Sequence, residues 1–189
     1  MKKILFILFL LVASLTVDAQ VNFMGIPVDG TATEMIQKLK NKGFYEIKKE
    51  VTYEMEGKTL PVLKGTFNGY DSNVYIATNK GKVYRVHIAR AGTVSEAQII
   101  TDFNNLFYQF TANPKYYLLD GNKIDRKEDI SYEMSCHNKQ YTVVFYQILS
   151  DSIEEENYVW FTIRKLSYDE YWISIFYDNL KNTSNGEDL

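Results

Sequence analysis

The sequence predicts an α+β fold in which two tandem units, each a helix followed by four strands, form one antiparallel sheet with the helices packed on one face. A pattern that starts helices, G-T-x-[ST]-E, occurs at 30–34 and again at 92–96. A second echo follows in the same order, with VTYEM at 51–55 and ISYEM at 130–134. Alternating strands rich in Tyr and Phe fill the rest of both units. Two echoes in the same order favour duplication over chance.

The first 19 residues are expected to be a secretory signal peptide rather than part of the fold. Lys2 and Lys3 precede an apolar run at 4–13, and cleavage is expected between Ala19 and Gln20. This run is shorter than the roughly 20 apolar residues that span a membrane, and no later segment is long enough. We therefore expect an exported protein, soluble in the periplasm or outside the cell, without a membrane span. Its parts are expected to be the signal peptide at 1–19, a first repeat at 20–90, a second at 91–178 that pairs with the first, and a frayed tail at 179–189.

In the first unit, the spacing of Thr31 and Glu34 is that of a capping box, in which each side chain accepts a hydrogen bond from the other residue's backbone. Met35, Ile36 and Leu39 then recur at helical spacing, and Gly43 is a typical stop, so a helix is predicted at 31–43. Strands are predicted at 51–55, 59–68, 73–78 and 82–89, with a hairpin turn at 79–82.

In the second unit, Ile99, Phe103, Leu106 and Phe110 lie on one helical stripe, which Pro114 ends. The segment at 130–134 reads as a strand, by its likeness to 51–55. Further strands are predicted at the following ranges: 115–119, 140–149, 158–166 and 170–178. The offset between the echoes grows from 62 residues at the helix starts to 79 at the second pair, so an insertion is expected around 113–129.

The phrase FMGIPVDGT at 23–31, with KGF at 42–44 after the first helix, resembles uncharacterised secreted proteins of Gram-negative bacteria that have a β-lactamase-inhibitor-protein-like fold. The order of one helix and four strands, twice, is similar to that fold as well. The resemblance implies an inhibitor, an assembly factor or another binding module rather than an enzyme. It carries no catalytic residues over to this chain.

Composition and motifs do not indicate nucleic-acid binding, a phosphate-binding loop or a catalytic Cys–His pair. Removal of two lysines and one aspartate with the signal changes the net charge from −3 to −4, which argues against nucleic acid as a partner. The stretch GIPVDGT at 25–31 lacks the lysine of a phosphate-binding loop. Cys136 and His137 are adjacent on a predicted strand, where their side chains would point to opposite faces.

Metal binding is not predicted either. The acidic loop that begins at Asp120 has Asp125 where a calcium-binding EF-hand loop needs glycine, and Ser131 where it needs glutamate. The acidic run at 151–156 reads as a solvated hairpin tip. We therefore expect no metal, no cofactor and no catalytic residues, although a hydrolase that uses two carboxylates stays open, because nothing singles out such a pair.

The most informative feature of the composition is its large number of aromatic residues. If helices cover one sheet face, the other exposes large rings, and the predicted exposed set is Tyr75, Tyr158, Trp160, Tyr171 and Tyr177. Such rings anchor partner proteins, because they bury much area at a low entropy cost, and they also stack on sugars. The sequence thus favours a non-enzymatic binding protein, with a ligand or glycan cleft between the repeats as the alternative. It equally allows both sheet faces to be buried, for instance in a homodimer.

Overall fold

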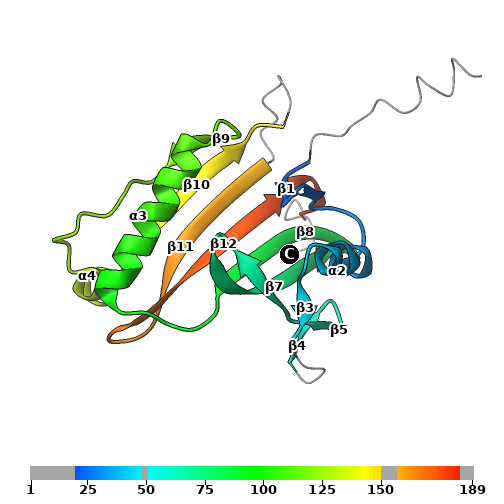
Figure 1. Ribbon diagram of the computed structural model, residues 1–189, viewed down its shortest axis with the longest axis horizontal. Coiled ribbons are helices and arrows are strands. Elements are labelled where there is room, and N and C mark those ends of the chain that lie inside the picture. Colours follow the sequence, from blue (N-terminus) through cyan, green and yellow to red (C-terminus); the bar gives the residue numbers. More distant parts are fainter. Residues whose placement is uncertain (1–19, 48–50, 150–156, 184–189) are drawn as a thin grey trace, which may run out of the picture.

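The computed structural model of the chain describes residues 20–47, 51–149 and 157–183. The predicted signal peptide, the acidic run at 151–156 and the end of the predicted tail at 184–189 lie outside the described residues. The centre is an eight-stranded antiparallel sheet (Figure 1). In spatial order its strands are β3 (Tyr45–Glu46), β6 (Leu63–Phe67), β7 (Tyr70–Asn79), β8 (Lys82–Arg90), β12 (Glu170–Asn179), β11 (Asn157–Ser167), β10 (Thr142–Gln147) and β9 (Tyr116–Asp120). The predicted α+β class with one large antiparallel sheet is confirmed.

The strand order divides the sheet into two groups that meet at its centre. Strands β3, β6, β7 and β8 lie side by side in chain order, and β9 to β12 do the same from the other edge. The last strands of the two groups, β8 and β12, pair with each other, for example Ile88 with Ile175. A helix precedes each group: α2 (Ala32–Asn41) and α3 (Glu96–Ala112). The duplication itself stays a prediction.

The remaining elements lie outside the large sheet. Two short hairpins form separate two-stranded sheets, β1 (Asn22–Phe23) with β2 (Ile26–Pro27) and β4 (Thr52–Met55) with β5 (Lys58–Pro61). A short helix, α4 (Ile130–Cys136), and a 3-10 turn, η1 (Leu180–Asn182), complete the described chain.

Helix α2 begins at the predicted capping box. The Glu34 backbone N–H donates to Thr31 Oγ1 at 3.3 Å, and the Thr31 N–H donates to Glu34 Oε2 at 2.9 Å. Met35 and Leu39 are then buried against the sheet. Gly30 precedes the cap at a φ of 77°, a conformation that glycine adopts without strain. The opening pattern at 30–34 is therefore explained by helix initiation alone.

Helix α3 starts at the second copy of that pattern, but its cap differs. Ser95 occupies the N-cap without a side-chain cap hydrogen bond. The Glu96 N–H instead donates to Asp169 Oδ1, at 2.8 Å, from the β11–β12 turn. The predicted stripe of Ile99, Phe103, Leu106 and Phe110 is buried, so α3 packs as its periodicity indicated.

The segment at 130–134 is helical, and the prediction of a strand there is wrong. Asp129 accepts a hydrogen bond from the Tyr132 N–H at 2.8 Å and so caps α4. Ile130 is fully buried and Met134, one helical turn later, packs against the same core. A local cap and helical spacing of the buried residues therefore outweigh the likeness to 51–55. The second echo does not mark matching elements.

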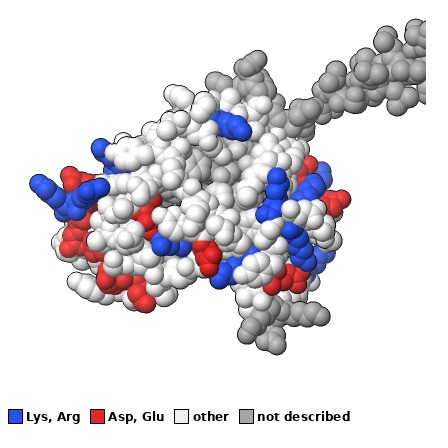
Figure 2. Space-filling model, in the orientation of Figure 1, with Lys and Arg blue, Asp and Glu red and all other residues white. Residues whose placement is uncertain are grey.

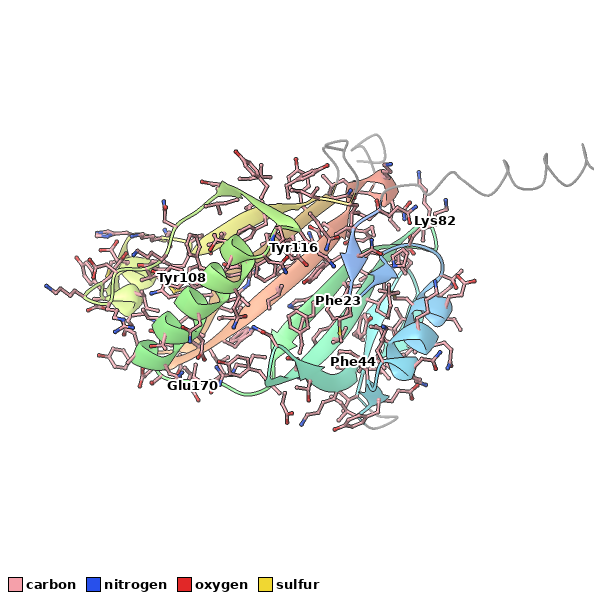
Figure 3. The ribbon with its side chains drawn as sticks, turned by 45° about the horizontal axis from the view of Figure 1, so that its top comes forward. Phe23, Phe44, Lys82, Tyr108, Tyr116 and Glu170 are labelled. Atoms are coloured by element: carbon pink, nitrogen blue, oxygen red, sulfur yellow. The ribbon has the colours of Figure 1, made fainter. Side chains whose placement is uncertain are left out.

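The helices α2, α3 and α4 cover the same face of the sheet, as Figures 1 and 3 show for α2 and α3. Strand residues of this face are buried with residues of all three helices in one core, for example Val86, Ile88, Val159, Phe161 and Ile175. Figure 3 shows Phe23 and Phe44 on this side, and the Phe44 ring lies so close to Gly65 that a Cβ there would be 2.4 Å from it. We call this side the helix-covered face.

The described start of the predicted tail, residues 179–183, is held in place. Asn179 is fully buried and its Nδ2 donates to the Val28 carbonyl at 2.8 Å. Asn182 Nδ2 donates to Asp29 Oδ1 at 2.7 Å and to the Val83 carbonyl at 2.9 Å. The prediction that fraying begins at residue 179 is therefore wrong, because these side chains tie 179–182 to the start of the chain.

Candidate binding surface on the uncovered sheet face

Four aromatic rings lie in a row across the four middle strands. The pairing register places Tyr75 opposite His87, His87 opposite Phe176, and Phe176 opposite Trp160. Successive ring centroids are 5.2, 4.4 and 3.9 Å apart, with interplanar angles of 22°, 10° and 16°. We call these four residues the ring ladder.

The ring ladder lies on the face opposite the helices. Its residues alternate along their strands with core residues such as Val86, Ile175 and Val159. Since side chains alternate between faces, the ladder must point away from the core. Within the described residues, no helix packs on this side, which we call the uncovered face. Tyr75, His87 and Trp160 are half-buried there by one another, and Phe176, inside the row, is 6% exposed.

The ladder is closed at its Tyr75 end by the β4–β5 hairpin. The Tyr53 ring meets the Tyr75 ring edge-on, with centroids 5.5 Å apart. Tyr53 Oη accepts from the Ile76 N–H and donates to the Ile76 carbonyl, and burial raises the pKa of Tyr53 to about 12. Both faces of His87 and Phe176 are covered by neighbouring rings. The two inner members of the ladder, His87 and Phe176, therefore present no open ring face to solvent.

Asp178 holds the other end of the ladder. The residue is 4% exposed, and its carboxylate accepts from Arg85 Nε at 2.6 Å and Arg85 Nη2 at 2.7 Å. It also accepts from Trp160 Nε1 at 2.8 Å, which fixes the orientation of the indole. The Arg85 guanidinium lies 5.0 Å from the Phe176 ring centroid and 5.5 Å from that of Trp160. The hydrogen bonds to Asp178 raise the pKa of Arg85, so this cation stays paired.

His87 is the titratable member of the row. Burial, aided by the nearby charges of Arg85 and Arg164, lowers the pKa of His87 to about 4. The ring is therefore neutral at pH 7, and its Nε2 lies 3.0 Å from Ser174 Oγ. A neutral imidazole stacks between Tyr75 and Phe176 without a buried charge.

Three of the five predicted surface aromatics, Tyr75, Tyr158 and Trp160, lie on this face, half-buried. The other two do not, so their predicted exposure is wrong. Tyr177 is 3% exposed and packs against Phe23, with centroids 5.1 Å apart, and Tyr171 is fully buried beside α3. Both point to the helix-covered face, because on β12 the uncovered face takes the even-numbered residues such as Phe176.

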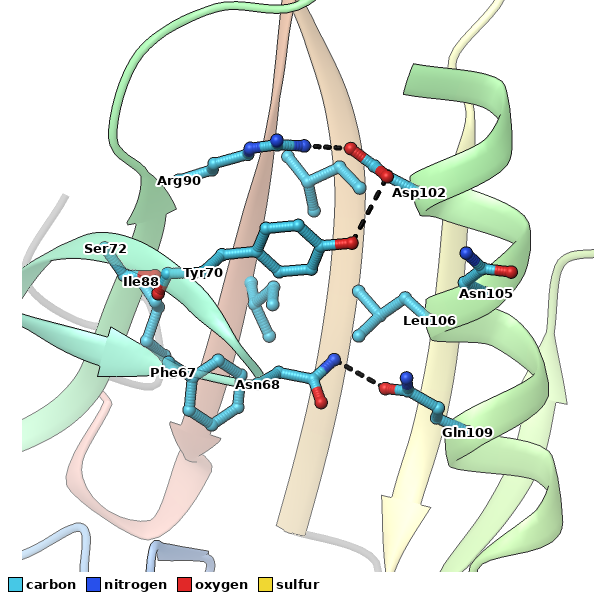
Figure 4. Close-up of a pocket in the computed structure, with 12 residues that line it drawn as sticks. Phe67, Asn68, Tyr70, Ser72, Ile88, Arg90, Asp102, Asn105, Leu106 and Gln109 are labelled. Carbon is cyan, nitrogen blue, oxygen red and sulfur yellow. Dashed lines mark hydrogen bonds and ion pairs between the residues drawn. The ribbon is translucent and has the colours of Figure 1, made fainter. Parts of the chain in front are cut away.

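A second feature is a groove on the helix-covered face between α3 and the β6–β7 turn (Figure 4). It consists of adjoining cavities of about 100 Å³ and about 380 Å³. Both are lined by Phe67, Asn68, Leu106 and Gln109. The floor of the smaller one includes side chains of the central strands β8 and β12. The groove thus lies where the two halves of the sheet meet.

Several polar groups of this groove are already paired with one another. Asp102 is 5% exposed and accepts from Arg90, from Gln98 Nε2 at 2.7 Å and from Tyr70 Oη at 3.3 Å. Asn68 donates to Gln109 of α3 at one end of the smaller cavity, as Figure 4 shows. The charged groups that line it, Arg90 and Asp102, neutralise each other. The groove therefore offers no unpaired charge from these two groups to an ionised ligand.

Charged side chains gather away from the middle of the helix-covered side. Figure 2 shows them mainly over α4 at one end and near α2 at the other. Among the described residues, no group of three or more His, Cys, Asp or Glu is placed to hold a metal ion. Cys136 and His137 end α4 rather than lying on a strand, and His137 Nδ1 is 3.0 Å from Glu133.

No helix in the described ranges has the length and apolar character needed to cross a bilayer. The chain matches no family model, no curated protein and no solved structure. The resemblance to β-lactamase-inhibitor-protein-like proteins therefore stays a prediction, and the candidate surface rests on its own geometry.

Proposed function

We propose that this chain is an exported, non-enzymatic binding protein that recognises another protein through the uncovered face of its sheet. The observation that carries the proposal is the ring ladder, four stacked rings on the face without a described helix. Large rings held in one orientation bury much area on binding and lose little side-chain entropy. The Asp178 anchor on Trp160 adds to that preorganisation.

The orientation of the rings favours a protein over a glycan. Sugars stack on open ring faces, but the faces of His87 and Phe176 are taken by their neighbours. The exposed ring edges instead carry the positive side of the ring quadrupole, which attracts carbonyl oxygens and the faces of other aromatic rings. Both groups are common on protein surfaces. Export, in this proposal, rests on the signal-like sequence at 1–19.

A photocrosslinking experiment tests this proposal. Placing p-benzoylphenylalanine at Tyr75 or at exposed Arg164, both on the uncovered face, should capture one discrete partner in the bacterial periplasm. The matched controls are Tyr108 on α3 and Tyr132 on α4, which are 52% and 53% exposed. The controls should give no such adduct. Equal capture from all four positions, or none from Tyr75 and Arg164, contradicts the proposal.

The groove supports a second candidate function, the binding of a small uncharged apolar ligand between the two halves. Its lining combines apolar side chains such as Ile88, Leu106 and Ile175 with polar ones, a combination that occurs in ligand pockets. The uncharged dye N-phenyl-1-naphthylamine should then bind saturably, and Leu106→Trp, which fills the groove, should abolish the fluorescence rise. Thr111→Trp, at an exposed position of the same helix, is the control and should bind dye normally. Equal binding by both variants would exclude the groove as the site.

A further inference from the structure

The two edges of the sheet are protected to different degrees. The β3 edge has only two residues and carries the ion pair of Lys40 with Glu46. The opposite edge, β9, has five residues and only one neighbouring strand, β10, in the described part of the chain (Figure 1). It contains no Lys or Pro, and Tyr117 and Leu119 are 62% and 47% exposed. Exposed apolar edge strands without lysine or proline attract further strands.

The backbone of β9 is oriented for such pairing at Leu118, whereas the Tyr116 N–H already donates to the Asn113 carbonyl at 3.0 Å. The Ile148 N–H donates to the Lys115 carbonyl at 2.8 Å, just before β9 begins. In an antiparallel ladder the inward and outward backbone groups alternate, and the register pairs Tyr117 with Tyr146 and Leu118 with Phe145. The N–H and C=O of Leu118 therefore point away from β10, towards the open edge.

We propose that β9 pairs antiparallel with β9 of a second copy of this chain, with Leu118 on the two-fold axis. In this register Tyr117 of each copy lies opposite Leu119 of the other copy. The exposed apolar side chains therefore cover each other. Asp120 lies opposite Tyr116, so no like charges meet. The pairing continues one eight-stranded sheet into the other and joins the two uncovered faces.

The symmetry of β9 itself favours a second copy over a foreign peptide. Its two exposed apolar residues stand one on each side of Leu118, so the strand supplies its own complement. The contact is one short strand pair, well below the area of a standard interface, so the dimer forms at high protein concentration. It does not involve the ring ladder and is independent of the proposed partner binding.

Disulfide trapping tests the register. Tyr117→Cys and Leu119→Cys are made separately, each with Cys136→Ser, and oxidised with copper phenanthroline alone or mixed. Directly opposite residues of a pair that is not hydrogen-bonded have Cα atoms about 4.5 Å apart, which suits a disulfide. The mixture should therefore give several-fold more linked dimer than either variant alone. Equal yields in all three samples would overturn the register, and Tyr45→Cys on β3 is the background control.

Sedimentation equilibrium tests the dimer itself. Wild-type protein should self-associate at high concentration, and Tyr117→Lys should weaken this by about tenfold or more, because a lysine on the edge strand opposes strand pairing. Tyr45→Lys on β3 and Tyr75→Lys on the uncovered face should leave it unchanged. Wild-type protein that stays monomeric, or association that resists Tyr117→Lys, refutes the proposal. The normal dimerisation of Tyr75→Lys separates this result from the proposed partner binding.

Discussion

Asp178→Ala is expected to lower the free energy of unfolding by about 3 kcal/mol, because it removes the buried partner of Arg85 and of the Trp160 indole N–H. The loss is placed at the low end for a broken buried pair, since the Arg85 side chain is 31% exposed and regains some hydration. Urea unfolding at pH 7 measures the change. The near-ultraviolet circular dichroism of Trp160 should weaken as well, because its ring loses the group that orients it.

The matched control is Asp71→Ala. Asp71 lies on β7, two strands away from β12, and pairs with Lys64 at 3.2 Å, but its side chain is 67% exposed. Exposed ion pairs contribute between about 0 and 1 kcal/mol, so this variant should unfold almost like the wild type. A similar small loss for both variants would show that Asp178 does not hold the ladder.

Acidification from pH 7.5 to pH 5 is expected to destabilise the protein through His87. The pKa of His87 is about 4 in the fold and near 6.5 in an unfolded chain. Between these values the unfolded chain binds more protons, so stability is complete above pH 6.5 and is lost as the pH falls towards 4. With 1.36 kcal/mol for each pKa unit, the loss by pH 5 is about 2 kcal/mol.

His87→Phe isolates this contribution. The phenyl ring keeps the stack with Tyr75 and Phe176 but does not titrate. Urea unfolding at several pH values should show the wild type losing about 2 kcal/mol more than the variant between pH 7.5 and pH 5. His137 and the carboxylates are present in both proteins and cancel in the difference. Parallel pH profiles would show that His87 is not held neutral within the ladder.

Local patterns predicted the parts of the fold that local interactions decide. The capping box of Thr31 and Glu34 and the apolar stripe of α3 are both present as predicted. The tyrosine, glutamate and methionine shared by 51–55 and 130–134 did not decide the structure, because only the second segment follows a helix cap, Asp129. A short sequence likeness therefore predicts the type of element less well than the capping residue that precedes the segment.

The candidate surface was only partly predictable. Alternation correctly placed Tyr158 with Trp160, and Tyr171 with Tyr177, on shared faces, but both faces of these strands are apolar. Only the packing of the helices determines which face is covered, so the second pair was assigned to the wrong side. His87 and Phe176 meet because of a strand register between residues 89 positions apart, which no local pattern encodes.

The central claim is that the uncovered face binds a partner, and the affinity of the crosslinked partner for two lysine variants tests it most directly. Tyr75→Lys breaks the ladder at an exposed ring edge, whereas Tyr108→Lys places the same charge on α3. A dominant anchor residue contributes about 2 kcal/mol or more, so Tyr75→Lys should raise the Kd by about 30-fold or more. Tyr108→Lys should leave it within about twofold of the wild type. Unchanged affinity of Tyr75→Lys, with weakened binding by Tyr108→Lys, would move the binding site to the helix-covered side and contradict the account.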